Sequence, residues 1–383
     1  MANPFRFTAC AKKIRALYNS KVDVPLFKAL LKTFFTLHLW PKSNGFSLKS
    51  FWRFFLIFSP GFLAILLFSV GLGTVEISWW TVLDALFNQN DENLASTLIW
   101  QVRLPRFFLA CLAGGTLAVA GQSMQILVRN PLADPYTMGT ASGAALGVNL
   151  AMSGWIPAFY TQFFMIPIWG FAGAMLSAML VLLLASGKGK FENASLLLIG
   201  VAVSILANSF ISLLTYYAAR QNEVRHLLFW AFGNLDKANW DSLGLATFFS
   251  VIGLLVLWLG SSSWNLLLLG DDKASSLKLN TKTTKYLLLI ISAFLTASIV
   301  CLVGPIGFVG LVVPFWSRKL ISVTQSAFWP ITFLIGALFL STCDLIARVA
   351  FQPFGLPIGL VTSLIGVPFF LYLLRDSSRK SSF

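Results

Sequence analysis

The segment from Phe107 to Val128 contains no charged residue and is bounded by Arg103 and Arg106 before it and by Arg129 after it. As an α-helix it would be roughly 33 Å long, enough to cross a hydrocarbon core of about 30 Å. In the whole chain 57% of the residues are hydrophobic and only 11% are charged, whereas soluble domains have about 25% charged residues. The sequence therefore predicts an all-α polytopic membrane protein.

Similar apolar stretches, separated by charged or Gly- and Pro-containing breaks, predict about ten transmembrane helices. Three regions follow: a basic cytoplasmic N-terminal extension (1–53), a transmembrane domain (54–374) and a cytoplasmic tail (375–383). The third and eighth spans are short and border Gly/Pro breaks, so we expect them to be tilted, broken or partly buried in protein. The ten expected spans are 54–73, 107–128, 138–154, 163–185, 195–219, 243–260, 285–303, 306–320, 329–350 and 356–374.

Basic residues are distributed unevenly between the two sides of the predicted membrane domain. Residues 1–53 contain ten Lys and Arg against the single acid Asp23, which places the N-terminus in the cytoplasm. With ten spans the C-terminus is also cytoplasmic, and 22 Lys/Arg and 6 Asp/Glu fall inside against 6 and 8 outside. Topology thus explains the net charge of +14 better than binding of nucleic acid does. The extension lies along the inner leaflet or forms a poorly ordered tail.

The groups expected of an enzyme or an ion-coupled carrier are scarce. Apart from Lys285, Arg318 and Lys319 at the cytoplasmic span ends, only Asp344 and Arg348 are charged within the spans, and their i, i+4 spacing also suits a helical ion pair. Four cysteines and two histidines are scattered without metal-ligand spacing, so no metal site is expected. The GK pairs at 186–191 lack the rest of a phosphate-binding loop. We expect no cofactor on this chain, and any ATP to be hydrolysed by a partner.

Three groups of motifs resemble the FecCD-type permease family, the membrane subunits of ABC importers for iron-siderophores, haem and cobalamin. The first, at 103–143, contains RLPR, GQSMQ, RNPLADP and MGTASGA. The second, at 304–318, reads GPIGFVGLVVPFWSR, with Phe315 in place of the family's histidine. The third joins the Asp344 and Arg348 pair to LPIGLVTSLIGVP at 356–368, with Gly355 where an acid is usual.

The segment at 264–284 is compact, charged and partly apolar, which is typical of two short surface helices presented to a partner, although a plain solvated loop is the alternative. It resembles the coupling loop of the family, LGExAxxLG, with Lys278 in place of the second glycine. The residues that the resemblance assigns to an ATPase-coupling loop are Leu269, Gly270, Asp271, Asp272, Ala274 and Leu277.

The resemblance implies a BtuC-like permease fold of ten helices with inverted pseudo-repeats. It also implies a second permease subunit, expected as a homodimer, two ABC ATPase subunits and a periplasmic substrate-binding protein. Arg103, Arg106 and Arg348 match family arginines that dock the binding protein; arginines anchored at lipid headgroups are the alternative. Polar residues of spans five and ten would line the translocation pathway or join helices, and these are Asn208, Ser209, Ser212, Thr215, Thr362 and Ser363.

We therefore expect a permease subunit in the bacterial cytoplasmic (inner) membrane that passes a ferric siderophore or related metal chelate from a periplasmic binding protein to the cytoplasm. An ion-gradient-driven secondary transporter is the alternative, and it is disfavoured because Asp344 is the one carboxylate within the expected spans and already has Arg348 one turn away. The chelate and the identity of the second subunit are left open at this stage.

Overall fold

The structure is a computed structural model that describes residues 48–73, 77–87, 94–152, 165–185, 193–218, 230–321, 327–350 and 355–380. This part of the chain contains helices and no β-strand, so the predicted all-α class is confirmed. Most of the N-terminal extension lies outside the described residues, and its predicted position is not tested.

Each of the ten expected spans overlaps a helix. Helix α3 begins at Leu48 rather than at residue 54, and α17 continues through most of the expected tail to Lys380. The ten helices are α3 (Leu48–Gly71), α6 (Leu104–Val128), α7 (Thr140–Met152), α8 (Ile166–Ala185), α9 (Asn193–Ala218), α11 (Trp240–Leu259), α14 (Thr281–Val303), α15 (Val309–Leu320), α16 (Phe328–Val349) and α17 (Ile358–Lys380).

Length and apolar composition separate these helices into two sets. Among the described residues six helical segments are long and apolar enough to cross a membrane, whereas the apolar parts of α3 and α17 are shorter and α7 and α15 are not among the six. The number of ten spans therefore stays a prediction. The six segments are 94–128, 166–185, 195–216, 240–259, 281–303 and 328–349.

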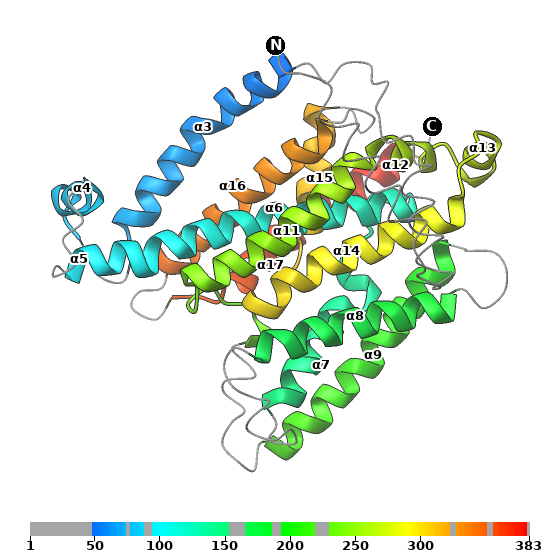
Figure 1. Ribbon diagram of the computed structural model, residues 1–383, viewed down its shortest axis with the longest axis horizontal. Helices are drawn as coiled ribbons and strands as arrows, with labels where there is room; N and C mark the ends of the chain where they lie inside the picture. Colours follow the sequence, from blue (N-terminus) through cyan, green and yellow to red (C-terminus); the bar gives the residue numbers. More distant parts are fainter. Residues whose placement is uncertain are drawn as a thin grey trace, which may run out of the picture.

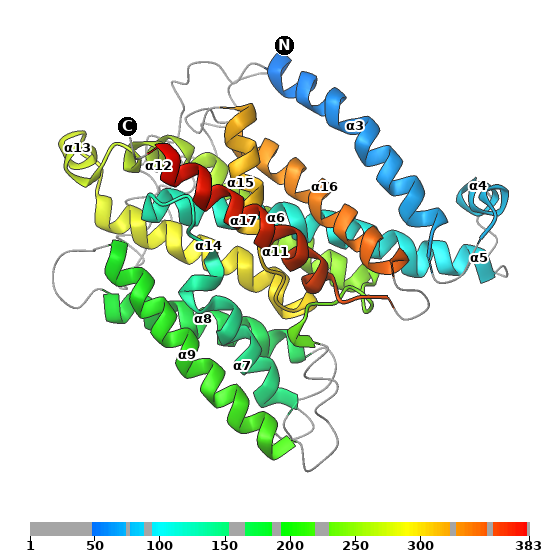
Figure 2. The ribbon, with the colours of Figure 1, turned by 180° about the vertical axis from the view of Figure 1, so that it is seen from behind.

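Helices α6 and α14 form the centre of the bundle. In their most apolar 18-residue stretches 78% and 72% of the residues are buried, against 22–28% in α8, α9 and α11. Figures 1 and 2 show α7, α8 and α9 together on one side of this pair and α3 with α16 on the other. The outer helices expose many leucine and isoleucine side chains, which suits lipid or a neighbouring subunit.

The two ends of the bundle carry different structures. The short helix α4 (Trp79–Phe87) lies beside residues 94–103, which lead into the N-terminal end of α6 (Figure 1). The short helices α12 (Ser261–Leu267) and α13 (Asp271–Ser276) lie at the opposite end, with the last turns of α17 (Figure 1). The outside and inside surfaces predicted from charge thus fall at opposite ends of α6.

Glycine contacts hold α6 directly against its neighbours. A Cβ atom on Gly114 would lie 2.2 Å from the carbonyl oxygen of Gly336 in α16, and one on Gly121 would lie 2.0 Å from that of Gly310 in α15. Small residues allow this approach, and close packing is the main attraction between helices in lipid. The position of α6 therefore depends on the absence of side chains at these two points.

We expect Gly121→Ala to separate α6 from α15 and to destabilise the protein by roughly 1–3 kcal/mol, because its methyl group would meet backbone rather than a mobile side chain. The measurement is the apparent melting temperature of the purified protein in detergent. Gly244→Ala in α11 is the matched control, since a Cβ there has no atom within 4 Å, and it should leave the melting temperature unchanged or raise it. Equal melting temperatures for the two variants would contradict this packing.

Candidate functional site

The N-terminal end of α6, which is predicted to lie outside, continues backwards without a break into a π-helix, η1 (Leu98–Arg103), and α5 (Leu94–Thr97). Single π-helical turns inside α-helices are frequent at functional sites. Arg103 is the last residue of η1, and Arg106 lies in the first turn of α6 after Pro105. This irregular turn therefore carries two of the three arginines predicted to dock a binding protein.

Arg103 and Arg348 bind the C-terminal end of α3. Arg103 donates hydrogen bonds to the carbonyl oxygens of Val70 and Gly71, the latter over 3.0 Å. Arg348, from α16, donates to the carbonyl oxygen of Ser69 over 3.1 Å and to its hydroxyl over 2.6 Å. The last carbonyls of a helix have no partner within the helix and carry partial negative charge. The two guanidinium groups thus cap α3 and tie it to α6 and α16.

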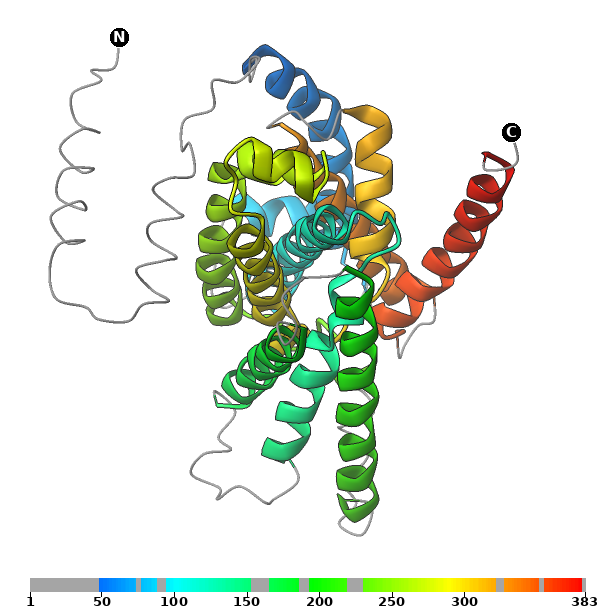
Figure 3. The ribbon, with the colours of Figure 1, turned by 90° about the vertical axis from the view of Figure 1, so that its right-hand side faces the viewer.

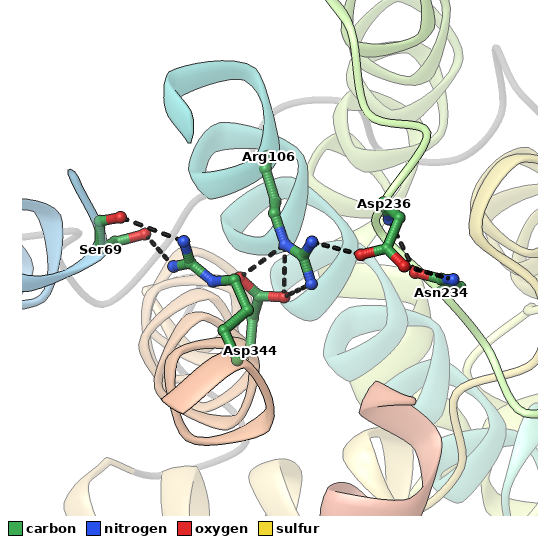
Figure 4. A network of polar contacts seen from close by, with 6 residues as sticks. Ser69, Arg106, Asn234, Asp236 and Asp344 are labelled. Carbon is green, nitrogen blue, oxygen red and sulfur yellow. Dashed lines mark hydrogen bonds and ion pairs between the residues drawn. The ribbon is translucent and has the colours of Figure 1, made fainter. Parts of the chain in front are cut away.

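Arg106 lies at the centre of a polar network that joins α6, α16 and the loop after Gly233 (Figure 4). Its Nε atom donates to both carboxylate oxygens of Asp344, over 2.9 and 3.2 Å, and its Nη1 atom pairs with Asp236. Asp344 also pairs with Arg348, from Oδ2 to Nε over 3.1 Å, which confirms the i, i+4 ion pair suggested by the sequence. Asp236 is fixed in turn by the Asn234 side-chain amide over 2.8 Å.

The structure therefore brings the three predicted docking arginines together but uses each of them within the chain. Arg103 and Arg348 are buried, and 13% of the Arg106 side chain is exposed beside the 64% exposed side chain of Asp236. The headgroup-anchoring alternative describes them less well, because their polar atoms bind protein groups. Docking of a partner stays a prediction for these residues, and Arg106 with Asp236 forms their accessible edge.

At the inside end, the segment predicted to form two short surface helices does so as α12 and α13. Within α13 only Ala274 is buried, and the neighbouring Leu269 and Leu277 expose 52% and 56% of their surface. Gly270 before the helix has φ 103° and Lys278 after it has φ 62°. The position at which Lys278 replaces the glycine of the family pattern is thus a left-handed turn, a conformation that costs a lysine about 1–2 kcal/mol.

An ion-pair cluster joins α13 to the body of the bundle. Asp271 accepts from Arg129, the left-handed residue that ends α6, and from the Nζ atom of Lys285 in the first turn of α14 over 2.7 Å. The Lys285 side chain is only 2% exposed. The turn after Arg129 is closed by its own bonds: Asn130 accepts from the amide of Leu132. Neither Arg129 nor Lys285 was predicted to take part in the coupling site.

A cavity of about 360 Å³ lies between α7 and α9. Asn208 and Thr215, two of the predicted pathway residues, line it. Sequence analysis did not find the facing polar residues Ser142 and Asn149 of α7. Small and polar residues dominate the full lining, which is Tyr136, Ala141, Ser142, Ala145, Asn149, Ser204, Asn208, Ile211, Thr215, Ala231 and Pro305.

The other four predicted pathway residues do not line this cavity. Ser209 and Ser212 donate to the carbonyls one turn earlier in α9. Thr362 and Ser363 in α17 both donate to the carbonyl oxygen of Gly359. In Figure 3 α9 (green) and α17 (red) extend in different directions, so the predicted pathway residues of α9 and those of α17 do not form one lining within a single copy. Their shared role in a pathway stays a prediction that requires a second subunit.

The chain matches a known transport family and is similar to named permease proteins. The family model described as "FecCD transport family" matches residues 61–376. The chain is 37% identical over 328 residues to the hemin transport system permease protein HmuU of Yersinia pestis, covering 84% of this chain and 96% of HmuU. It is 36% identical over 329 residues to the iron-uptake system permease protein FeuB of Bacillus subtilis, covering 85% and 97%.

A further relative and one solved structure agree with these matches. The cobalamin import system permease protein BtuC of Halobacterium salinarum is 37% identical over 283 residues, covering 74% of each chain. The structure of a metal-chelate type ABC transporter in an inward-facing conformation superposes with a TM-score of 0.74 and 27% identity. It covers 85% of this chain and 99% of that one.

The polar network around Arg106 predicts that substitutions of its two aspartates differ greatly in their effect on stability. Asp344→Asn should destabilise the protein by about 3–5 kcal/mol, because it removes the carboxylate from a 1% exposed position between Arg106 and Arg348. Asp236→Asn is the matched control and should cost less than about 1 kcal/mol, since Asp236 is largely exposed. The yield of folded protein and its melting temperature measure both effects. A wild-type melting temperature for Asp344→Asn would refute the structural role of the network.

Proposed function

The chain belongs to the FecCD transport family, and on this premise we propose that it is the permease subunit of an ABC importer that moves a ferric siderophore or a related metal chelate into the cytoplasm. The observation that carries this proposal is the family match over residues 61–376. Relatives named for hemin, iron and cobalamin transport and a metal-chelate transporter of similar fold support it. These findings favour an importer over an ion-gradient-driven secondary transporter.

The proposed assembly contains two copies of this chain, two ABC ATPase subunits and a periplasmic binding protein. It resides in the bacterial cytoplasmic membrane with both termini inside. The apolar faces of α9 and α17 support contact with a second copy, because large apolar side chains are exposed there. Leu198, Ile205 and Leu364 expose 72%, 62% and 71% of their surface. Such faces are covered by lipid or by a neighbouring membrane helix.

We place binding-protein docking at the outside end of α6. A carboxylate on the partner would meet Arg106 where that arginine already pairs with exposed Asp236. Exposed pairs of this kind contribute about 0.2–1 kcal/mol each, so they would orient the partner more than hold it. Arg103 and Arg348 stabilise this edge. Arg103 binds the end of α3, and Arg348 binds both α3 and Asp344.

The cavity between α7 and α9 supports passage of an uncharged or charge-shielded cargo. Among the described residues its polar lining consists of hydroxyl and amide groups, without a carboxylate, lysine or arginine. At about 360 Å³ it lies near the lower end of the range of about 300–1,000 Å³ for small-molecule sites. A bulky chelate would place only part of its surface there while it moves past α9.

The proposal predicts import that depends on ATP at the inside face. The protein is reconstituted in liposomes with its ATPase, with binding protein loaded with a ferric siderophore outside, and radioactive iron is counted inside. Uptake should require ATP in the lumen and persist when ionophores remove all ion gradients. Uptake that follows an imposed ion gradient without ATP would overturn the proposal.

Two tryptophan variants provide the control for the pathway in the same assay. Asn208→Trp fills the cavity and should reduce uptake about tenfold or more while the ATPase subunits remain bound. Leu206→Trp places the same bulk on an exposed part of α9 outside the cavity and should transport normally. Equal uptake by the two variants would remove the cavity from the pathway.

A further inference from the structure

The orientation of α13 depends on very few contacts. It is a six-residue helix, and helices of this length are not stable alone in water. Its ends are a glycine with φ 103° and a lysine with φ 62°, and its other side chains are largely exposed apart from Ala274. The orientation of α13 must therefore be fixed by its contacts with neighbouring helices.

Asp271 supplies a charged attachment to two different helices at once. One carboxylate oxygen meets Arg129 at the end of α6, and the other meets Lys285 of α14 over 2.7 Å. Helices α6 and α14 are the most buried spans of the described chain. A displacement of α13 thus cannot leave both ion pairs intact unless α6 and α14 move with it.

Burial of one partner distinguishes the Lys285 pair from ordinary surface salt bridges. The Lys285 side chain is 2% exposed, whereas the side chains of Arg129 and Asp271 are 30% and 42% exposed. Breaking an ion pair with a buried partner is far more costly than breaking an exposed one, because the buried charge loses its counter-charge. The adjacent Asp272 is exposed and has no ion-pair partner among the described residues, although it carries the same charge on the same helix.

We propose that Asp271 is the positioning residue that makes α13 move as one body with the inside ends of α6 and α14. The inference rests on the proposed function, in which the ATPase docks on the surface of α12 and α13. Displacement of α13 by the ATPase then passes through Asp271 to Arg129 and along α6, whose outside end holds the Arg106 network. Without the carboxylate, ATP hydrolysis moves α13 but no longer moves the bundle efficiently.

The experiment compares Asp271→Asn and Asp271→Glu in the reconstituted transporter. The readout is the number of chelates imported per ATP hydrolysed, which a loss of folded protein alone does not change. Asp271→Asn should reduce this ratio about tenfold, because buried Lys285 loses its counter-charge. Asp271→Glu should stay within about twofold of the wild-type ratio, because it keeps the carboxylate.

A wild-type ratio for Asp271→Asn, or an equal loss for Asp271→Glu, would overturn the inference. Failure of the wild-type protein to import with ATP would instead overturn the proposed function. Hydrogen exchange of the permease without its partners gives a second, independent readout. There Asp271→Asn should accelerate exchange of the α13 amides, with Asp272→Asn unchanged, and slow exchange in both variants would again contradict the role of Asp271.

Discussion

The close approach of helix backbones along α6 is the constraint on which the other features depend. Gly114 and Gly121 bring α16 and α15 against α6 where any side chain would collide with a carbonyl group. In lipid no hydrophobic driving force holds helices together, so this packing supplies much of the attraction. With α6 fixed laterally, the groups at its two ends occupy set positions on opposite faces of the bundle.

At both ends of α6, arginine side chains are paired with acceptor groups of the same chain, and these acceptors differ between the two ends. Outside, Arg103 and Arg106 meet helix-end carbonyls and two aspartates, and inside, Arg129 meets the aspartate of a surface helix. Charges near a membrane are retained where they pair or serve a function. In the proposed function the same groups also serve the partners, because the edge at Arg106 is proposed to receive the binding protein and Arg129 is attached to the surface proposed for the ATPase.

The sequence was most informative where the signal is local. Charge-free stretches of about 20 residues located the helices, the short charged segment at 264–284 was correctly expected to form two helices, and the spacing of Asp344 and Arg348 predicted their ion pair. The partners that complete the sites are distant in sequence and carry no pattern of their own. Asp236 lies 130 residues from Arg106, and Asp271 lies 142 residues from Arg129. Asn149 is an isolated polar residue on an apolar helix, so only the packing of α7 on α9 reveals it.

We propose that this chain works as a permease driven by separate ATPase subunits, which dock on the surface formed by α12 and α13. Native mass spectrometry of the complex, purified through a tag on this chain from cells that also express the ATPase, tests it most directly. The account predicts an assembly of two copies of this chain with two ATPase subunits. It further predicts that Leu269→Glu with Leu277→Glu releases the ATPase and leaves the two permeases together. An ATPase that stays bound to this double variant, or a wild-type chain that purifies without any ATPase, would contradict the account.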